Sequence, residues 1–256
     1  MDNNDTALVR LEDVWVALGL LTRLPLPPRD WDETRPAARA AWAYPLAGLI
    51  VATLSCLLAS VLLWLGLPAT VTAAATLMAL TLLTGAMHED GLADTADGLW
   101  GGPTPARRLE IMKDSHIGAY GVIALISGFA LRWSALSALI AAGWLWTPVL
   151  VAAILSRTAM AYVMDILPNA RSSGLSKLTG RPGKQATRIA AGLSVVAAFV
   201  AFGFAGFWLV LVAALTLLTC ATIAKRKIGG QTGDILGATQ CLTEIALLVA
   251  ISALVL

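Results

Sequence analysis

Residues 43–66 read AYPLAGLIVATLSCLLASVLLWLG and contain no charged side chain. A helix needs about 20 mostly apolar residues to cross the hydrocarbon core of a bilayer. This stretch therefore predicts a membrane-spanning helix, and the rest of the chain can be searched for further runs of the same kind.

Similar apolar runs recur along the chain between short charged blocks. The expected spans are residues 43–66, 68–87, 119–141, 144–164, 189–203, 205–224 and 236–256. The run 189–203 is short, and Gly203 to Gly206 leaves little room for a complete turn, so six spans or a re-entrant hairpin remain alternatives. The pattern predicts an all-α, polytopic integral membrane helix bundle with about seven transmembrane helices.

The composition agrees with a membrane protein. Hydrophobic residues make up 58% of the chain and charged residues 13%, which is untypical of a soluble domain. A net charge of +2, spread over several loops, does not suggest a nucleic-acid partner. The three cysteines lie within or beside apolar runs, so no disulfide framework is expected.

The basic residues predict the orientation. They fall before the first expected span and after the second, fourth and sixth: Arg10, Arg23, Arg29, Arg35, Arg39; Arg107, Arg108, Lys113; Arg171, Lys177, Arg181, Lys184, Arg188; Lys225, Arg226, Lys227. Seven spans place all of these on one face, which the positive-inside rule assigns to the cytoplasm of an inner membrane.

We expect a single membrane domain over residues 1–256. Residues 1–42 form a cytoplasmic segment with a short interfacial helix near 11–24, because this apolar run is too short to span and ends at prolines. The bundle occupies residues 43–256, with cytoplasmic loops at 88–118, 165–188 and 225–235.

The most informative polar stretch is HEDGLADTADG, residues 88–98. Glu89, Asp90, Asp94 and Asp97 fall within nine residues, and on a helix the three aspartates would share one face. Crowded carboxylates favour a hard cation, so Mg²⁺ is expected, with Mn²⁺ as a substitute, and the four residues are both the metal and the catalytic candidates. The alternative is a solvated acidic turn.

Three charged residues fall inside expected spans, where an unpaired charge costs roughly 2.5–3.5 kcal/mol. Arg132 is expected to pair or to reach the interface, and Glu244 to have a structural partner. For Arg157 the sequence leaves phosphate binding and an ion pair open.

Several blocks resemble one family. They are residues 88–98; RRLEIMKDSHIGAYG at 107–121; LTRLP at 21–25; SR at 156–157; AR at 170–171 with GL at 174–175; and GGQTGD at 229–234 with GA at 237–238. Together they are similar to the cobalamin synthase family, the adenosylcobinamide-GDP ribazoletransferases. Ser176 departs from a glycine expected in many members.

The resemblance implies a Mg²⁺-dependent membrane enzyme. It would join adenosylcobinamide-GDP to α-ribazole or its 5′-phosphate, release GMP and form adenosylcobalamin or its phosphate. The expected substrate-binding residues are Lys113, Asp114, Arg157, Arg171, Gly233 and Asp234. The expected partners are the two substrates and the lipid bilayer; a homo-oligomer or contacts with other enzymes of the pathway are left open.

Two other classes of membrane protein share some of these features. The CDP-alcohol phosphotransferases also begin their acidic motif with Asp-Gly and use membrane-embedded carboxylates. Their motif has arginine at the position where this chain has Asp94. A secondary transporter could use Arg157 and Glu244 along a pathway, yet its site is expected at the bilayer midplane and often between inverted repeats, and no repeat is apparent.

Overall fold

The structure is a computed structural model that describes residues 9–27 and 35–256. Residues 1–8 and 28–34, part of the expected N-terminal segment, lie outside the described residues. Nearly all regular structure in the described part is helical, with one isolated β-bridge between Asn169 and Gln231. The expected all-α class is confirmed.

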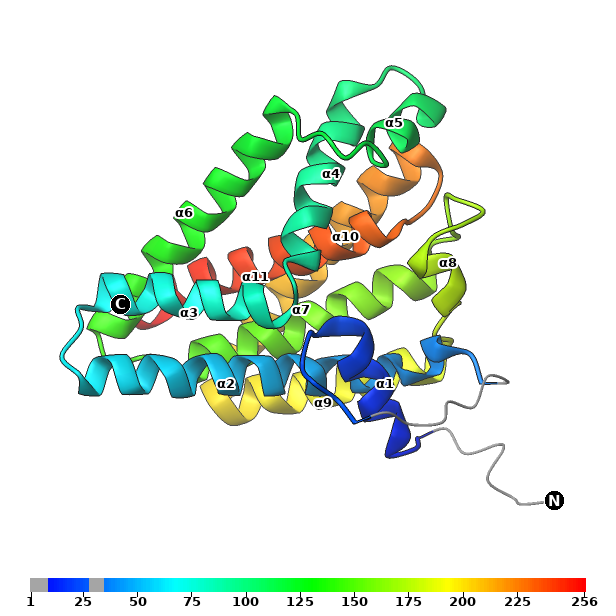
Figure 1. Ribbon diagram of the computed structural model, residues 1–256. Helices are drawn as coiled ribbons and strands as arrows, with labels where there is room; N and C mark the ends of the chain where they lie inside the picture. Colours follow the sequence, from blue (N-terminus) through cyan, green and yellow to red (C-terminus); the bar gives the residue numbers. More distant parts are fainter. Residues whose placement is uncertain (1–8, 28–34) are drawn as a thin grey trace.

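Helices make up most of the described part of the chain (Figure 1). Their bounds are α1 Glu12–Leu21, η1 Ala37–Ala43, α2 Tyr44–Trp64, α3 Ala69–Leu83, α4 Met87–Gly101, α5 Pro105–Ile111, α6 Ala119–Ala141, α7 Trp146–Ile166, α8 Leu175–Thr179, α9 Lys184–Phe202, η2 Gly203–Ala205, α10 Gly206–Ile228 and α11 Gly233–Val255. The short helix expected near residues 11–24 is present as α1.

Helix α7 forms the centre of the bundle. It packs against α2, α9, α10 and α11, and most of its side chains are buried. Small residues allow the close approach: a Cβ on Gly48 of α2 would lie 2.5 Å from the Ala153 carbonyl oxygen of α7. The apolar faces of α2 and α7 therefore meet backbone to backbone, as is common between helices in membranes.

Within residues 9–27 and 35–256, five helical segments are long and apolar enough to cross a membrane: residues 37–64, Ala119–Ala141, Trp146–Ile166, residues 184–228 and Gly233–Val255. The number becomes six if α3 and α4 together count as one broken span. The chain is thus a multi-pass membrane protein by length and composition, and the expected count of seven is not confirmed.

The segment 184–228 is a hairpin rather than one long helix. It breaks at Gly203, whose φ is +54°, and a Cβ on Gly206 would lie 2.6 Å from the Ala198 carbonyl oxygen. Residues eight apart in a continuous helix are about 12 Å apart along its axis. The chain therefore reverses direction here, and α9 packs against α10.

The expected span 68–87 is wrong in its last four residues. Helix α3 ends at Leu83, and α4 begins at Met87 after a bend of 88°. Gly85 and Ala86 take left-handed conformations, with φ of +66° and +57°, and Ala86 is the one described non-glycine residue with positive φ. The acidic stretch is consequently a helix packed against α6 and α11, not an open turn.

Close packing of α4 on α11 depends on Gly91. A Cβ at this position would lie 2.8 Å from the Asp234 carbonyl oxygen. We expect Gly91→Ala to push the helices apart and lower stability by about 1–3 kcal/mol, seen as a lower Tm in detergent. Gly192→Ala is the matched control, because nothing lies within 4 Å of a Cβ there. Equal Tm values for the two variants would contradict the expected contact.

Candidate functional site

A polar pocket with a volume of about 180 Å³ lies between α4, α8 and the start of α11. Asp90 enters it from α4, Asp234 from the first turn of α11, and Arg171 and Lys177 from the connection that contains α8. The pocket thus brings together carboxylates and cationic groups from segments far apart in the sequence. Four of the expected site residues line it: Asp90, Arg171, Gly233 and Asp234.

Asp234 is held firmly at the pocket wall. Arg171 Nη1 donates to its Oδ2 at 2.9 Å, and Thr232 Oγ1 donates to the same atom at 3.1 Å. Thr232 also caps α11, accepting a hydrogen bond from the Ile235 backbone N–H. Asp234 therefore sits at the positive end of the α11 dipole, where a negative charge is stabilised.

Arg171 connects two parts of the site. Besides Asp234, its Nη2 donates to the Leu109 carbonyl oxygen at 3.1 Å, which ties α5 to the pocket. The Arg171 and Asp234 side chains keep 16% and 20% of their surface exposed, so this ion pair remains open to a ligand.

Asp94 lies one turn beyond Asp90 on α4 and is partly buried. Its carboxylate experiences the charges of Asp90, Asp234 and Asp97, with Arg171 the one opposing charge resolved among its neighbours. Like charges at a partly buried position are unfavourable unless a cation or a proton compensates them. Asp90 and Asp234 therefore line the pocket, with Asp94 one turn away on α4, where the charge of Asp97 also acts on it.

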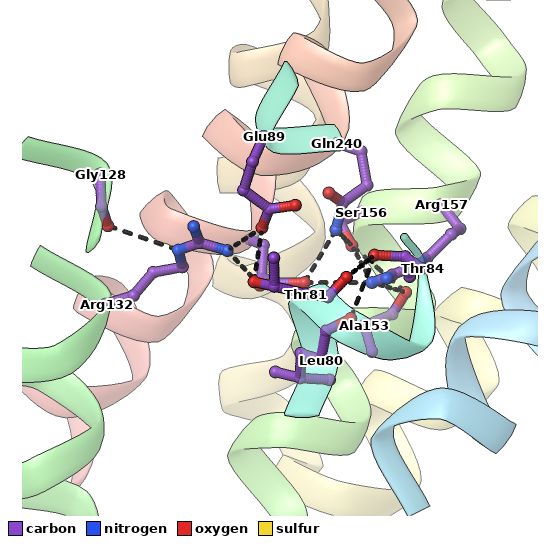
Figure 2. Close-up of polar contacts among 11 residues, drawn as sticks. Leu80, Thr81, Thr84, Glu89, Gly128, Arg132, Ala153, Ser156, Arg157 and Gln240 are labelled. Atoms are coloured by element: carbon purple, nitrogen blue, oxygen red, sulfur yellow. Dashed lines mark hydrogen bonds and ion pairs between the residues drawn. The ribbon is translucent and has the colours of Figure 1, made fainter. Parts of the chain in front are cut away.

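Glu89 belongs to a different cluster, inside the bundle (Figure 2). Arg132 Nη1 donates to Glu89 Oε1 at 3.1 Å and to Glu244 Oε1 at 3.2 Å, while Arg157 Nη1 donates to Glu244 Oε2 at 3.0 Å. Gln240 adds a hydrogen bond to Glu244. The expectation that the charges inside the spans have partners is confirmed.

Asp97 is also engaged elsewhere. Its two carboxylate oxygens accept backbone N–H groups of Gly118 and Gly121, at 2.7 and 2.9 Å, and so join the end of α4 to the start of α6. The sequence grouped Glu89, Asp90, Asp94 and Asp97 as one metal set; in the structure Asp90 lines the pocket, whereas Glu89 pairs with Arg132 and Asp97 accepts backbone N–H groups. Among residues 9–27 and 35–256, no three His, Cys, Asp or Glu side chains stand together as a ready metal site.

The remaining expected substrate ligands lie away from the pocket. Lys113 and Asp114 are exposed in the connection after α5, where hydrogen bonds from His116 hold the pKa of Asp114 below its usual value. Arg157 is 2% exposed and is paired with Glu244, so the ion-pair alternative describes its position.

The pocket contains polar residues that the sequence did not single out as ligands. Gln231 hydrogen-bonds to two other residues of the pocket. Its Nε2 donates to Asn169 Oδ1 at 2.6 Å, and Ser176 Oγ donates to Gln231 Oε1 at 2.6 Å. Lys177 lines the pocket beside them. Gln231 belongs to the block at 229–234, which the sequence did single out. Ser176 departs from the family pattern, and its hydroxyl hydrogen-bonds to Gln231 in this network.

Comparison with known proteins identifies the family. The family model described as "Cobalamin-5-phosphate synthase" matches residues 13–252. A relative named adenosylcobinamide-GDP ribazoletransferase from Bradyrhizobium diazoefficiens is 44% identical over 95% of this chain and 94% of its own length. Relatives of the same name from a Sinorhizobium species and from Sinorhizobium medicae are 43% and 41% identical over 94% of this chain and 96% of theirs.

No solved structure matches the chain. The family model covers nearly all described residues, and the relatives extend over almost the whole sequence, including the acidic helix and the start of α11. The matches favour the resemblance over the phosphotransferase and transporter alternatives. The chain belongs to the cobalamin-5-phosphate synthase family, whose members named above are transferases.

Proposed function

We propose that this chain is a Mg²⁺-dependent adenosylcobinamide-GDP ribazoletransferase of the inner membrane. It joins adenosylcobinamide-GDP to α-ribazole or α-ribazole 5′-phosphate and releases GMP. The observation that carries the proposal is the pocket where Asp90 and Asp234 face Arg171 and Lys177. Such a pocket can hold a charged diphosphate and also accept a proton.

The donor atoms suit Mg²⁺. Carboxylate oxygens are its preferred protein ligands, and Mg²⁺ commonly binds through one or two carboxylates together with substrate phosphates. The substrate diphosphate would complete the ligand set. Asp90 and Asp94 would hold the ion, with Asp234 beside them.

The residues around the pocket account for the chemistry. When bound, Mg²⁺ neutralises charge on the diphosphate and on the departing GMP. Arg171 and Lys177 orient the phosphate oxygens, Arg171 through its two-pronged guanidinium. A carboxylate of the Asp90, Asp94 and Asp234 group takes the proton from the ribazole hydroxyl as its oxygen bonds to the cobinamide-bound phosphorus. The bond from that phosphorus to GMP then breaks.

The direct test is turnover by the purified protein in detergent. Adenosylcobinamide-GDP, α-ribazole and Mg²⁺ should yield GMP and an equal amount of adenosylcobalamin, measured by chromatography. Uptake of a substrate into vesicles without GMP release would refute the proposed function and favour a transporter.

The metal requirement is a separate prediction. Activity should disappear with a chelator and return with Mg²⁺ or Mn²⁺, whereas Ca²⁺, with longer bonds and looser geometry, should restore little. The measurement is the rate of GMP release after each ion is added back to the chelated protein. Full activity in excess chelator would rule out a required divalent ion.

The orientation gives a further prediction, because the pocket lies on the same expected face as the basic loops. Reporter fusions after Arg107, Lys184 and Lys227 should report the cytoplasm, and those after Gly66, Ala142 and Leu256 the outside. A cytoplasmic signal at Leu256 would contradict the seven-span arrangement. The side of the membrane on which the pocket lies would still be reported by the fusions after Arg107, Lys184 and Lys227.

A further inference from the structure

A second, narrow pocket adjoins the acidic pocket. It is enclosed by α1, α2, α4, α7, α8 and α11, and Met87, Met160 and Met164 contribute to its largely apolar lining. The two pockets share Met87, Leu175, Ser176 and Gly233. One ligand could therefore place an apolar part in the narrow pocket and a polar part beside Asp90 and Asp234.

Two polar side chains in this apolar lining lack partners. Tyr44 is 1% exposed and His88 2%, and within the described chain neither the Tyr44 hydroxyl nor either His88 ring nitrogen makes a hydrogen bond. Buried polar groups in native proteins are nearly always hydrogen-bonded. Two such groups on one pocket wall indicate that a ligand supplies the missing partner.

We propose that the narrow pocket binds the dimethylbenzimidazole base of the ribazole acceptor, an inference that rests on the proposed function. This base is a flat, methylated bicycle with one ring nitrogen free to accept a hydrogen bond. Methionine side chains make favourable contacts with aromatic rings and adapt to a narrow space. Tyr44 or His88 donates to the ring nitrogen, and the attached ribose then lies toward the carboxylates.

The other base among the substrates, guanine, fits less well. Guanine presents N1–H and an exocyclic amine as donors and a carbonyl oxygen as an acceptor. Among the described residues, the lining contains no Asp, Glu, Asn or Gln side chain to receive those donors. Burying guanine there would leave several of its polar groups without partners, at a cost in affinity.

The test compares two acceptors with each protein. One is α-ribazole, and the other is the dimethylindole riboside in which a C–H group replaces the accepting ring nitrogen. Binding is measured by equilibrium dialysis with purified full-length protein and no adenosylcobinamide-GDP, so the result does not depend on turnover. The unaltered protein should bind α-ribazole about fivefold to tenfold more tightly, the effect of one hydrogen bond.

Removal of the donor should abolish that preference. Tyr44→Phe and His88→Phe are measured separately, and in at least one of them the two ribosides should bind equally. Unchanged binding of the indole riboside shows that the variant pocket is still formed. Tyr162→Phe, a change on α7 outside both pockets, should keep the preference.

The outcomes separate this inference from the proposed function. GMP release by the unaltered protein tests the function by itself. Equal binding of the two ribosides by the unaltered protein, or a preference kept in both variants, would overturn the base assignment. If Tyr44→Phe or His88→Phe weakens the binding of adenosylcobinamide-GDP but leaves the binding of α-ribazole unchanged, the pocket binds guanine. That result would also overturn the base assignment.

Discussion

Asp94→Asn is expected to lower kcat at least ~100-fold while the protein still folds. The substitution keeps the shape of the side chain but removes a charge from the centre of the carboxylate group formed with Asp90 and Asp234. Loss of one preorganised electrostatic group typically costs 10²–10³ in rate. Folding should not suffer, because the change relieves repulsion between neighbouring carboxylates. Steady-state GMP release and Tm in detergent are the measurements.

Glu110→Gln is the matched control. Glu110 lies on the neighbouring helix α5, and its exposed side chain pairs with Arg107 at the surface. This variant should retain both kcat and Tm. Wild-type kcat in purified, metal-loaded Asp94→Asn would show that the acidic helix is not part of the catalytic machinery.

Glu244→Gln is expected to give the opposite pattern, a large loss of stability. Glu244 is 3% exposed and accepts hydrogen bonds from both Arg132 and Arg157. Neutralising it leaves the Arg157 guanidinium without its carboxylate partner in the bundle interior. Breaking a buried ion pair by removing one partner typically costs 3–5 kcal/mol. Thermal unfolding in detergent and the yield of purified protein measure this loss.

A second change distinguishes unpaired charge from lost packing. Arg157→Met in the Glu244→Gln background removes the uncompensated charge, while Arg132 keeps its bond to Glu89. Stability should recover in part, because apolar replacement of a buried ion pair is often neutral. If the double variant is less stable than Glu244→Gln, the charge account of this cluster is wrong.

The contrast between these variants shows why the sequence could not predict which acidic residues of α4 face the pocket and which face the bundle interior. Glu89 and Asp90 are adjacent in the chain, but α4 turns one into the bundle toward Arg132 and the other into the pocket. A helical wheel places the three aspartates on one face, yet Asp97 meets the start of α6 while Asp90 meets the pocket of α11. The identity of the neighbour on each face depends on packing between distant segments.

The sequence by itself determined the helical membrane class, the family resemblance, the importance of residues 88–98 and 229–234, and the need for partners around the charges in the spans. These follow from local properties: apolar run length, desolvation cost and motif spacing. Only the tertiary structure decided that α3 ends at Leu83, that Arg157 pairs with Glu244, and that Asp234 and Arg171 join Asp90 in one pocket. Such contacts arise where helices distant in sequence cross, and local pattern carries no information about which side chains meet there.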